Sequence, residues 1–421
     1  MRRGVASIVC AVAVLALCPS AGFADGGPIM PLSEVQAGMD CTADTVIHAT
    51  TISSFDVHVL GVVQEPQIGP RILIRASGPA VEGTGIAEGF SGSPVYCPDA
   101  MGEMRNAGAI SAGVGDYGND DALVTPIEQM LGEPVTPPSS APRFTGRVRP
   151  LLGPLMVGGL SQSLLHLLQK AGASAGRTIL AVPADAASSF PVQPLVPGAS
   201  VAVGYSDGAI PTGGVGTVTY RDGANVYAFG HELDGAGRRS LLLQDAYVYS
   251  VIGNPNGLSY KLAAPGHTVG TLTSDTPNAV VGQVGPAPTL VPVHATARDL
   301  DTGREISLDS DVADETAIGL PLGTSLVDVI APMEAGQAAT AIYDGPPGKR
   351  VRADVRDRGA PREPPAAAVL QPIRGDGIPG RRRPPAARAR HRSHDRPVLG
   401  LRTARAGAVR IASRHEGRRS D

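Results

Sequence analysis

Alternating apolar and polar residues predict short β-strands over most of the chain between residues 30 and 312. In FDVHVLGV, Phe55, Val57 and Val59 share one face and the polar residues between them share the other, which is typical of a half-buried strand. Further strands are expected in RILIRASG, SPVYC, AGAISAGV, ASVAVGY, GGVGTVTYRDG, NVYAFGH, DAYVYSVIG, TVGTLTSD and TLVPVHATARD. An Asp-Gly pair inside YRDGANVYAFGH predicts a tight hairpin.

Two segments have a helical pattern instead. In TPIEQMLGEP, Thr125 is expected to cap a short helix, Glu128 to complete a capping box and Gly132 to end it. LSQSLLHLLQKAG has leucines on one face, with Ser161 as the expected cap and Gly172 as the stop. The chain is therefore expected to hold a few short helices among many strands.

These elements divide into two β-rich lobes, expected at 30–133 and 195–312. The connection at 134–194 begins with a Pro/Ser-rich linker and contains the leucine-rich helix, and a C-terminal extension follows at 313–344. The composition fits this picture, because 53 glycines, 38 prolines and the absence of tryptophan favour short strands joined by turns. We therefore predict a mostly β, two-lobed fold.

The N-terminus, 1–24, has the pattern of a secretory signal. Arg2 and Arg3 precede the apolar run VASIVCAVAVLALC, and small residues then predict cleavage after Ala24. A lipoprotein signal at Cys18 is disfavoured because a large leucine precedes it, and an uncleaved membrane anchor is the other alternative. We expect the mature chain to act outside the cytoplasm, secreted or anchored to the membrane.

Two of the four cysteines lie in this signal, which leaves Cys41 and Cys97. In an oxidising compartment such a pair suggests one disulfide, and the alternative is two buried thiols. Cys97 closely follows a serine-containing turn, which a disulfide would hold in place. No histidine or cysteine pair has metal-ligand spacing and no glycine loop fits a phosphate, so we expect neither a metal nor a cofactor.

The net charge of −3 gives the whole chain no electrostatic attraction to nucleic acid. The average hides a basic C-terminus, because 345–421 is rich in arginine, proline, alanine and glycine and lacks apolar periodicity. Two interpretations stand: a disordered tail that binds anionic surfaces, or the translation of a GC-rich gene in a shifted frame.

The stretch GFSGSPVY, residues 89–96, contains the first candidate for chemistry. Ser91 is the candidate nucleophile, and Gly89 allows a turn in which its own N–H and that of Ser91 converge on one oxyanion. Gly92 tolerates backbone angles that a side chain forbids, and Pro94 directs the chain into the next strand. The competing interpretation is an ordinary serine in a tight turn.

A serine nucleophile needs a base, and the chain has nine histidines. His231 ends the apolar strand VYAFGH after a glycine, where a side chain can project into a cleft. His267 follows Pro-Gly and is expected in a turn, and the remaining histidines are expected in strands, in the helix or in the tail. His231 is therefore the candidate base, with a solvated turn histidine as the alternative.

Taken together, GTVTYRDGANVYAFGHELD and GFSGSPVY resemble the histidine and nucleophile blocks of the SpoIVB family of serine peptidases, which are secreted or membrane-anchored enzymes of sporulation signalling. FDVHVLGV, AGAISAGV, DALVTPIEQML and HTVGTLTSDTPNAVVGQVG resemble the surroundings of those blocks, over roughly 30–133 and 195–295. The resemblance implies a trypsin-like double β-barrel, with Ser91 as nucleophile and His231 as general base.

Two departures from that family concern the candidate site. Ser91 precedes His231, so the two lobes come in exchanged order, which is tolerable because triads are recognised by geometry and not by chain order. The stretch RASGPAVEGTGIAE, where the family has its aspartate, contains only Glu82 and Glu88 as acids. Asp234 in GHELD is taken as the candidate acid, with Asp245 as a further alternative.

These inferences predict a secreted serine endopeptidase that cleaves protein or peptide substrates, including itself, and that pairs them with the small-residue strand at 109–114. The alternative is a non-catalytic relative that binds peptides or envelope proteins, which the missing aspartate favours. A third interpretation is a structural envelope protein whose glycine-rich strands only mimic the two blocks. No nucleic-acid partner is expected.

Overall fold

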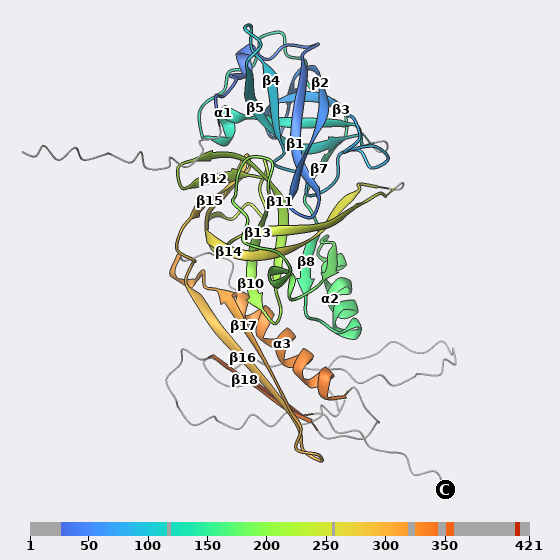
Figure 1. Ribbon diagram of the computed structural model, residues 1–421, viewed down its shortest axis with the longest axis vertical. Coiled ribbons are helices and arrows are strands. Elements are labelled where there is room, and N and C mark those ends of the chain that lie inside the picture. The colour runs from blue at the N-terminus through green and yellow to red at the C-terminus, as the bar shows by residue number, and fades with distance from the viewer. Residues whose placement is uncertain are drawn as a thin grey trace, which may run out of the picture.

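The computed structural model describes residues 27–115, 119–254, 257–318, 325–343, 351–357 and 409–412. It is mostly β and contains two sheets, which confirms the expected fold class at that level. Figure 1 shows the first sheet at the top and the second below it. The predicted signal at 1–24 lies outside the described residues.

The first sheet has the order β4-β1-β2-β3-β6-β5-β7. Its strands are β1 (Asp40–His48), β2 (Thr51–Glu65), β3 (Gly69–Ser77), β4 (Pro94–Pro98), β5 (Met104–Val114), β6 (Asp121–Pro126) and β7 (Val148–Pro150), preceded by the 3-10 helix η1 (Leu32–Glu34). Because β4 pairs with both β1 and β5, the first six of these strands form a closed ring, which we call the first ring. β7 lies outside it, at the free edge of β5.

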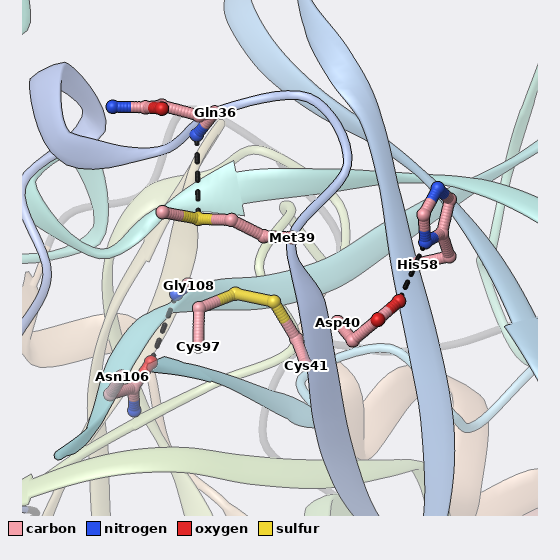
Figure 2. The surroundings of a disulfide bond; sticks show 8 residues. All are labelled: Gln36, Met39, Asp40, Cys41, His58, Cys97, Asn106 and Gly108. Carbon is pink, nitrogen blue, oxygen red and sulfur yellow. Dashed lines mark hydrogen bonds and ion pairs between the residues drawn. A yellow bond between two sulfur atoms is a disulfide. The ribbon is translucent and has the colours of Figure 1, made fainter. Parts of the chain in front are cut away.

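The periodic pattern in β2 has the predicted effect. Phe55, Val57 and Val59 are buried and the residues between them are exposed, so the strand contributes alternate side chains to the core of the ring. Cys41 on β1 and Cys97 on β4 form the expected disulfide, which ties these two neighbouring strands together (Figure 2). The pair is buried within the same core.

The short helix α1 (Ile127–Met130) differs from its prediction. Thr125 belongs to β6 and does not cap the helix, because its hydroxyl donates a 2.7 Å hydrogen bond to the carbonyl of Gly230 in the second sheet. Glu128 forms no capping box either, because its carboxylate accepts a 2.7 Å hydrogen bond from the backbone N–H of Leu32. Both predicted capping groups are used for contacts between distant segments.

The second sheet has the order β19-β18-β16-β17-β10-β13-β14-β15-β12-β11-β8-β9. Its strands are β8 (Leu155–Gly158), β9 (Ile179–Val182), β10 (Ser200–Gly208), β11 (Thr212–Asp222), β12 (Asn225–Ala228), β13 (Gly237–Ile252), β14 (Tyr260–Thr276), β15 (Ala279–Val284), β16 (Leu290–Asp299), β17 (Glu305–Ala313), β18 (Val351–Asp357) and β19 (Val409–Ala412). Because β10 also pairs with β11, strands β10, β13, β14, β15, β12 and β11 form a second ring.

Several predictions about this sheet can be compared with it directly. The hairpin β11–β12 is confirmed, with Asp222 paired to Asn225 and Gly223 at a φ of +55°. His267 lies inside the long strand β14 and not in a turn. The parallel pair β8–β9 lies entirely within 134–194, the stretch expected as a linker and a helix.

The helices lie outside the two rings. α2 (Gln162–Ser174) is the predicted leucine-rich helix; Ser161 precedes it without a side-chain capping bond, and the helix continues two residues past Gly172. α3 (Leu326–Tyr343) was not predicted and contacts β16 and β17 (Figure 1). The 3-10 helices η2 (Ala186–Ser189) and η3 (Thr316–Ile318) complete the list. No helix within the described ranges has the length and apolar character needed to cross a bilayer.

Within the Arg/Pro-rich tail, 345–421, the structure describes only β18 and β19, which extend the second sheet next to β16. The rest of that predicted tail lies outside the described residues. The described part of the tail is therefore strand, and it lies far along the sheet from the first ring (Figure 1).

The two rings contact each other through buried polar groups. The Asn106 side-chain amide donates a 3.0 Å hydrogen bond to the carbonyl of Thr219, whose hydroxyl donates a 2.7 Å bond to the carbonyl of Gly92. Ala49 and Val248 also exchange backbone hydrogen bonds between the two sheets. The serine-containing turn therefore lies where the two rings meet.

Candidate active site

The turn Gly89–Ser93, which leads into β4, is buried between the rings. Gly89 and Gly92 have φ values of +88° and +92°, which L-residues with side chains rarely adopt. A Cβ atom at position 92 would also overlap the carbonyl oxygen of Thr217. The glycines of the Gly-Phe-Ser-Gly motif are thus required by the geometry of the turn.

The backbone N–H groups of this turn fall into two sets. Those of Phe90, Gly92 and Ser93 donate hydrogen bonds of 2.8–2.9 Å to backbone carbonyls. Those of Gly89 and Ser91 donate to no acceptor within the part of the chain that the structure describes. Buried backbone donors are almost always satisfied in proteins, so two unsatisfied donors on either side of Phe90 are unusual. They are the two groups that the sequence assigned to the oxyanion.

His231 follows β12 after two residues with positive φ, Phe229 at +68° and Gly230 at +69°. Its Nδ1 lies 2.5 Å from the backbone carbonyl of Glu232, which can only accept, so we assign the proton to Nδ1. Nε2 is buried and has no hydrogen-bond partner among the described residues. This tautomer leaves the Nε2 lone pair available to accept a proton.

Burial lowers the pKa of His231, although the carbonyl of Glu232 acts in the opposite direction. The residue as a whole is half-buried, whereas Nε2 itself is not exposed to solvent. A lowered pKa keeps the imidazole neutral at neutral pH, and a base must be neutral before it can accept a proton.

Thr217 on β11 joins the two candidate blocks. Its N–H donates a 2.8 Å hydrogen bond to the carbonyl of Ser91, and its own carbonyl accepts a 3.3 Å bond from the N–H of Phe229, two residues before His231. The structure therefore brings Gly89, Ser91 and His231 into one region. The Ser91 hydroxyl forms no hydrogen bond with His231 or with any other described residue.

The candidate acids are not part of this region. The Asp234 carboxylate binds the guanidinium of Arg239 and does not reach His231, which corrects the prediction that Asp234 orients the base. The alternative Asp245 is fully buried and binds His267 instead, at 3.0 Å from Nδ1. Within the described residues, the Nδ1 of His231 therefore has a backbone carbonyl as partner, where serine peptidases usually have a carboxylate.

Sequence reasoning missed Lys261, which lies directly behind the turn. Its Nζ donates hydrogen bonds to the hydroxyls of Thr45 (2.8 Å) and Thr217 (3.1 Å), and the Thr217 hydroxyl bonds the carbonyl of Gly89 at 3.1 Å. Nζ also lies 5.1 Å from the centre of the Phe90 ring. Burial lowers the pKa of Lys261 to about 7.

Lys261 and Thr217 together fix the direction of the Gly89 carbonyl, and with it the turn that contains the two unsatisfied N–H groups. The pattern around Lys261, YKLAAP, gave no sign of this, because a lysine in an alternating strand is normally solvated. Only the long-range pairing of β14 could have shown that its side chain points into the interface.

No family model, curated protein or solved structure matches this chain. Across the described ranges, no group of three or more His, Cys, Asp or Glu side chains is arranged to hold a metal ion. The functional argument therefore depends on the geometry of the region around Ser91 and His231.

Proposed function

We propose that the protein is a secreted serine endopeptidase of the SpoIVB type, with Ser91 as nucleophile and His231 as general base. The observation that carries the proposal is the pair of unsatisfied, buried N–H groups at Gly89 and Ser91, close to a histidine whose buried Nε2 is also unsatisfied. Such unpaired groups are costly in a folded protein unless a ligand or a transition state uses them.

The fold supports this proposal in a second way. Each sheet contains a closed ring of six strands, and the candidate site lies between the rings. We propose that the two rings correspond to the two β-barrels of a trypsin-like enzyme, whose active site lies between them, with the nucleophile-bearing ring first in the chain. The resemblance of the two sequence blocks to the SpoIVB family agrees with this exchanged order.

In the proposed reaction, Ser91 Oγ attacks the peptide carbonyl carbon while His231 Nε2 accepts the hydroxyl proton. The N–H groups of Gly89 and Ser91 stabilise the oxyanion. His231 then gives its proton to the leaving amine, the acyl-enzyme forms, and water hydrolyses it by the reverse sequence of proton transfers.

Among the described residues, a backbone carbonyl and not a carboxylate binds Nδ1 of His231, and this should lower the rate of the proposed reaction. The carbonyl of Glu232 fixes the ring and its tautomer, but it stabilises the imidazolium less than an anion does. In a well-studied triad, neutralising the aspartate lowers kcat by about 10⁴-fold. We therefore propose a slow endopeptidase, and the second candidate function is a non-catalytic peptide- or envelope-binding relative, which the same observation favours.

The test is covalent labelling of the full chain with a fluorophosphonate that reacts with activated serines, followed by mass analysis of the labelled peptide. We expect labelling at Ser91, lost in Ser91→Ala and in His231→Ala. Ser93→Ala is the matched control, because Ser93 is also buried in the turn and should not react. Folded protein that never becomes labelled at Ser91 would contradict catalysis and favour the binding function.

A further inference from the structure

The stretch expected as a linker contains β7, which pairs antiparallel with the free edge of β5. The paired residues are Ala112 with Pro150, Gly113 with Arg149, and Val114 with Val148. The same edge binds the nucleophile turn further along the strand, because Ile110 exchanges backbone hydrogen bonds with Gly92 (2.8 Å) and Ser93 (3.1 Å). β7 and the turn that contains Ser91 are thus neighbours on one edge of β5.

Leu151 follows β7 and comes next along this edge, between β7 and the turn. Its side chain is fully buried in the core cluster that also contains Phe90. Burial is the largest effect on the pKa of His231 and lowers it. The Leu151 backbone raises this pKa, because it lies beside the histidine ring. The segment therefore places an apolar side chain and a peptide group directly at the candidate site.

The chain then passes over the candidate oxyanion donors. A Cβ atom added to Gly153 would lie 3.7 Å from the N atom of Gly89 and 3.3 Å from the carbonyl oxygen of Val215 in the second ring. The N–H groups of Gly89 and Ser91 nevertheless remain unsatisfied, so the Leu151 carbonyl does not lie between them. The segment therefore runs from the edge of β5 to the turn that contains the candidate oxyanion donors.

We propose that residues 148–153 are a built-in occupant of the peptide groove, so that the site is latent in this form. The inference rests on the proposed function. It also identifies the substrate class: an extended peptide that adds to the edge of β5 and places an apolar side chain of leucine's size beside Ser91. The occupant must leave β5 before another peptide can bind there.

The attachment of β7 suits a displaceable occupant. The strand is three residues long and lies at the end of its sheet, where a competing strand can replace it. A pocket of about 710 Å³ flanks it, lined by Glu88, Tyr260 and the β7 residues themselves. Solvent and ligands therefore reach one side of β7, whereas Leu151 is enclosed.

The first test compares the rate of fluorophosphonate labelling at Ser91 in the full chain and in Leu151→Asp. An aspartate cannot remain in the apolar core, so the groove should open, and we expect labelling to accelerate about tenfold or more because a larger fraction of molecules is competent. Leu167→Asp on α2 is the matched control, since Leu167 is 63 % exposed and lies outside the occupant, and it should label at the wild-type rate. Equal rates in folded Leu151→Asp and wild type would overturn the latency.

A second pair of variants avoids the risk that Leu151→Asp fails to fold. Ala112→Cys together with Pro150→Cys places two thiols at paired positions of β5 and β7. Oxidation should lock the occupant in place and suppress labelling about tenfold, and reduction should restore it. Wild type treated with the same reductant controls for loss of the Cys41–Cys97 disulfide. A locked protein that labels as fast as the reduced one would overturn the proposal.

The substrate class is tested with the peptide Val-Arg-Pro-Leu, the sequence of residues 148–151, ending in an aldehyde. It should block labelling of Leu151→Asp, and the same peptide ending in aspartate aldehyde should not. Equal blocking by both peptides would overturn the assigned specificity. Labelling that occurs but does not respond to any of these changes refutes only the latency, whereas no labelling in any folded form refutes the proposed function as well.

Discussion

At the scale of single residues, the site is defined more by unpaired groups than by contacts. Gly89 and Ser91 have free N–H groups, and His231 has a free Nε2, although all three atoms are buried among described residues. The sequence predicted these residues because a Gly-x-Ser-Gly turn and a strand-end histidine have local signatures. It could not predict the acid, because Asp234 lies only three positions from His231 yet is bound by Arg239.

The protonation of His231 leads to a prediction about pH. Burial lowers its pKa below the ordinary value of 6.5, so the neutral, basic form persists to a lower pH than for a solvated histidine. We expect the labelling rate of Ser91 to reach half of its maximum at a pH below 6.5. Rate constants measured across neutral and acidic pH check this, with circular dichroism showing that the fold persists. A half-maximal rate above pH 6.5 would contradict the assignment of His231 as the base.

Lys261 leads to a second prediction, about stability. Its folded pKa is about 7 and its ordinary value is 10.5, so between these values the unfolded chain binds more protons and the free energy of unfolding rises with pH. Lys261→Met removes this penalty and leaves Thr45 and Thr217 in contact with each other at 3.3 Å. We expect the free energy of unfolding of the variant to exceed that of wild type by on the order of a few kcal/mol near pH 7, and by much less near pH 10.

Urea denaturation of Lys261→Met and wild type at both pH values measures this difference. An exposed lysine, Lys170 on α2, changed to Met, provides the control for the loss of one lysine side chain. A stability difference between Lys261→Met and wild type that is the same at both pH values would show that Lys261 is charged in the folded protein.

At the scale of elements, strands were predictable where the period of two extends over several residues, as in β2, and where turn residues mark a hairpin, as in β11–β12. β7 was not predictable, because three residues beside prolines form no pattern. The cap of α1 was predicted wrongly for a related reason. Thr125 and Glu128 have the right local spacing, but both bind groups that are far away in sequence, and tertiary hydrogen bonds outweigh a local cap.

At the scale of the whole molecule, the closing strand pairs decide where the site lies. β4 closes the first ring by pairing with β1 and β5, and the nucleophile turn leads directly into β4. β10 closes the second ring by pairing with β11, and Thr217 on β11 bonds both candidate blocks. Such long-range pairings leave no local signal in one sequence, so the mostly β character was predictable but the contact between the rings was not.

The disulfide between Cys41 and Cys97 should contribute to stability at this scale, because it joins the two strands at which the first ring closes. It bridges positions 56 residues apart, so it restricts the unfolded chain considerably. Replacing both cysteines by serine should lower the free energy of unfolding by roughly 2–4 kcal/mol.

Urea denaturation of the double variant and of wild type, each with and without reductant, measures the contribution of the disulfide. Wild type in reductant should resemble the variant, and the variant should not respond to reductant. Because Ser91 lies six residues before Cys97 and its turn leads into β4, loosening this strand should also slow labelling at Ser91 under mild denaturant, before the second ring unfolds. Equal stability of wild type and variant would show that the hydrogen bonds of β4 to β1 and β5 hold the ring closed without the disulfide.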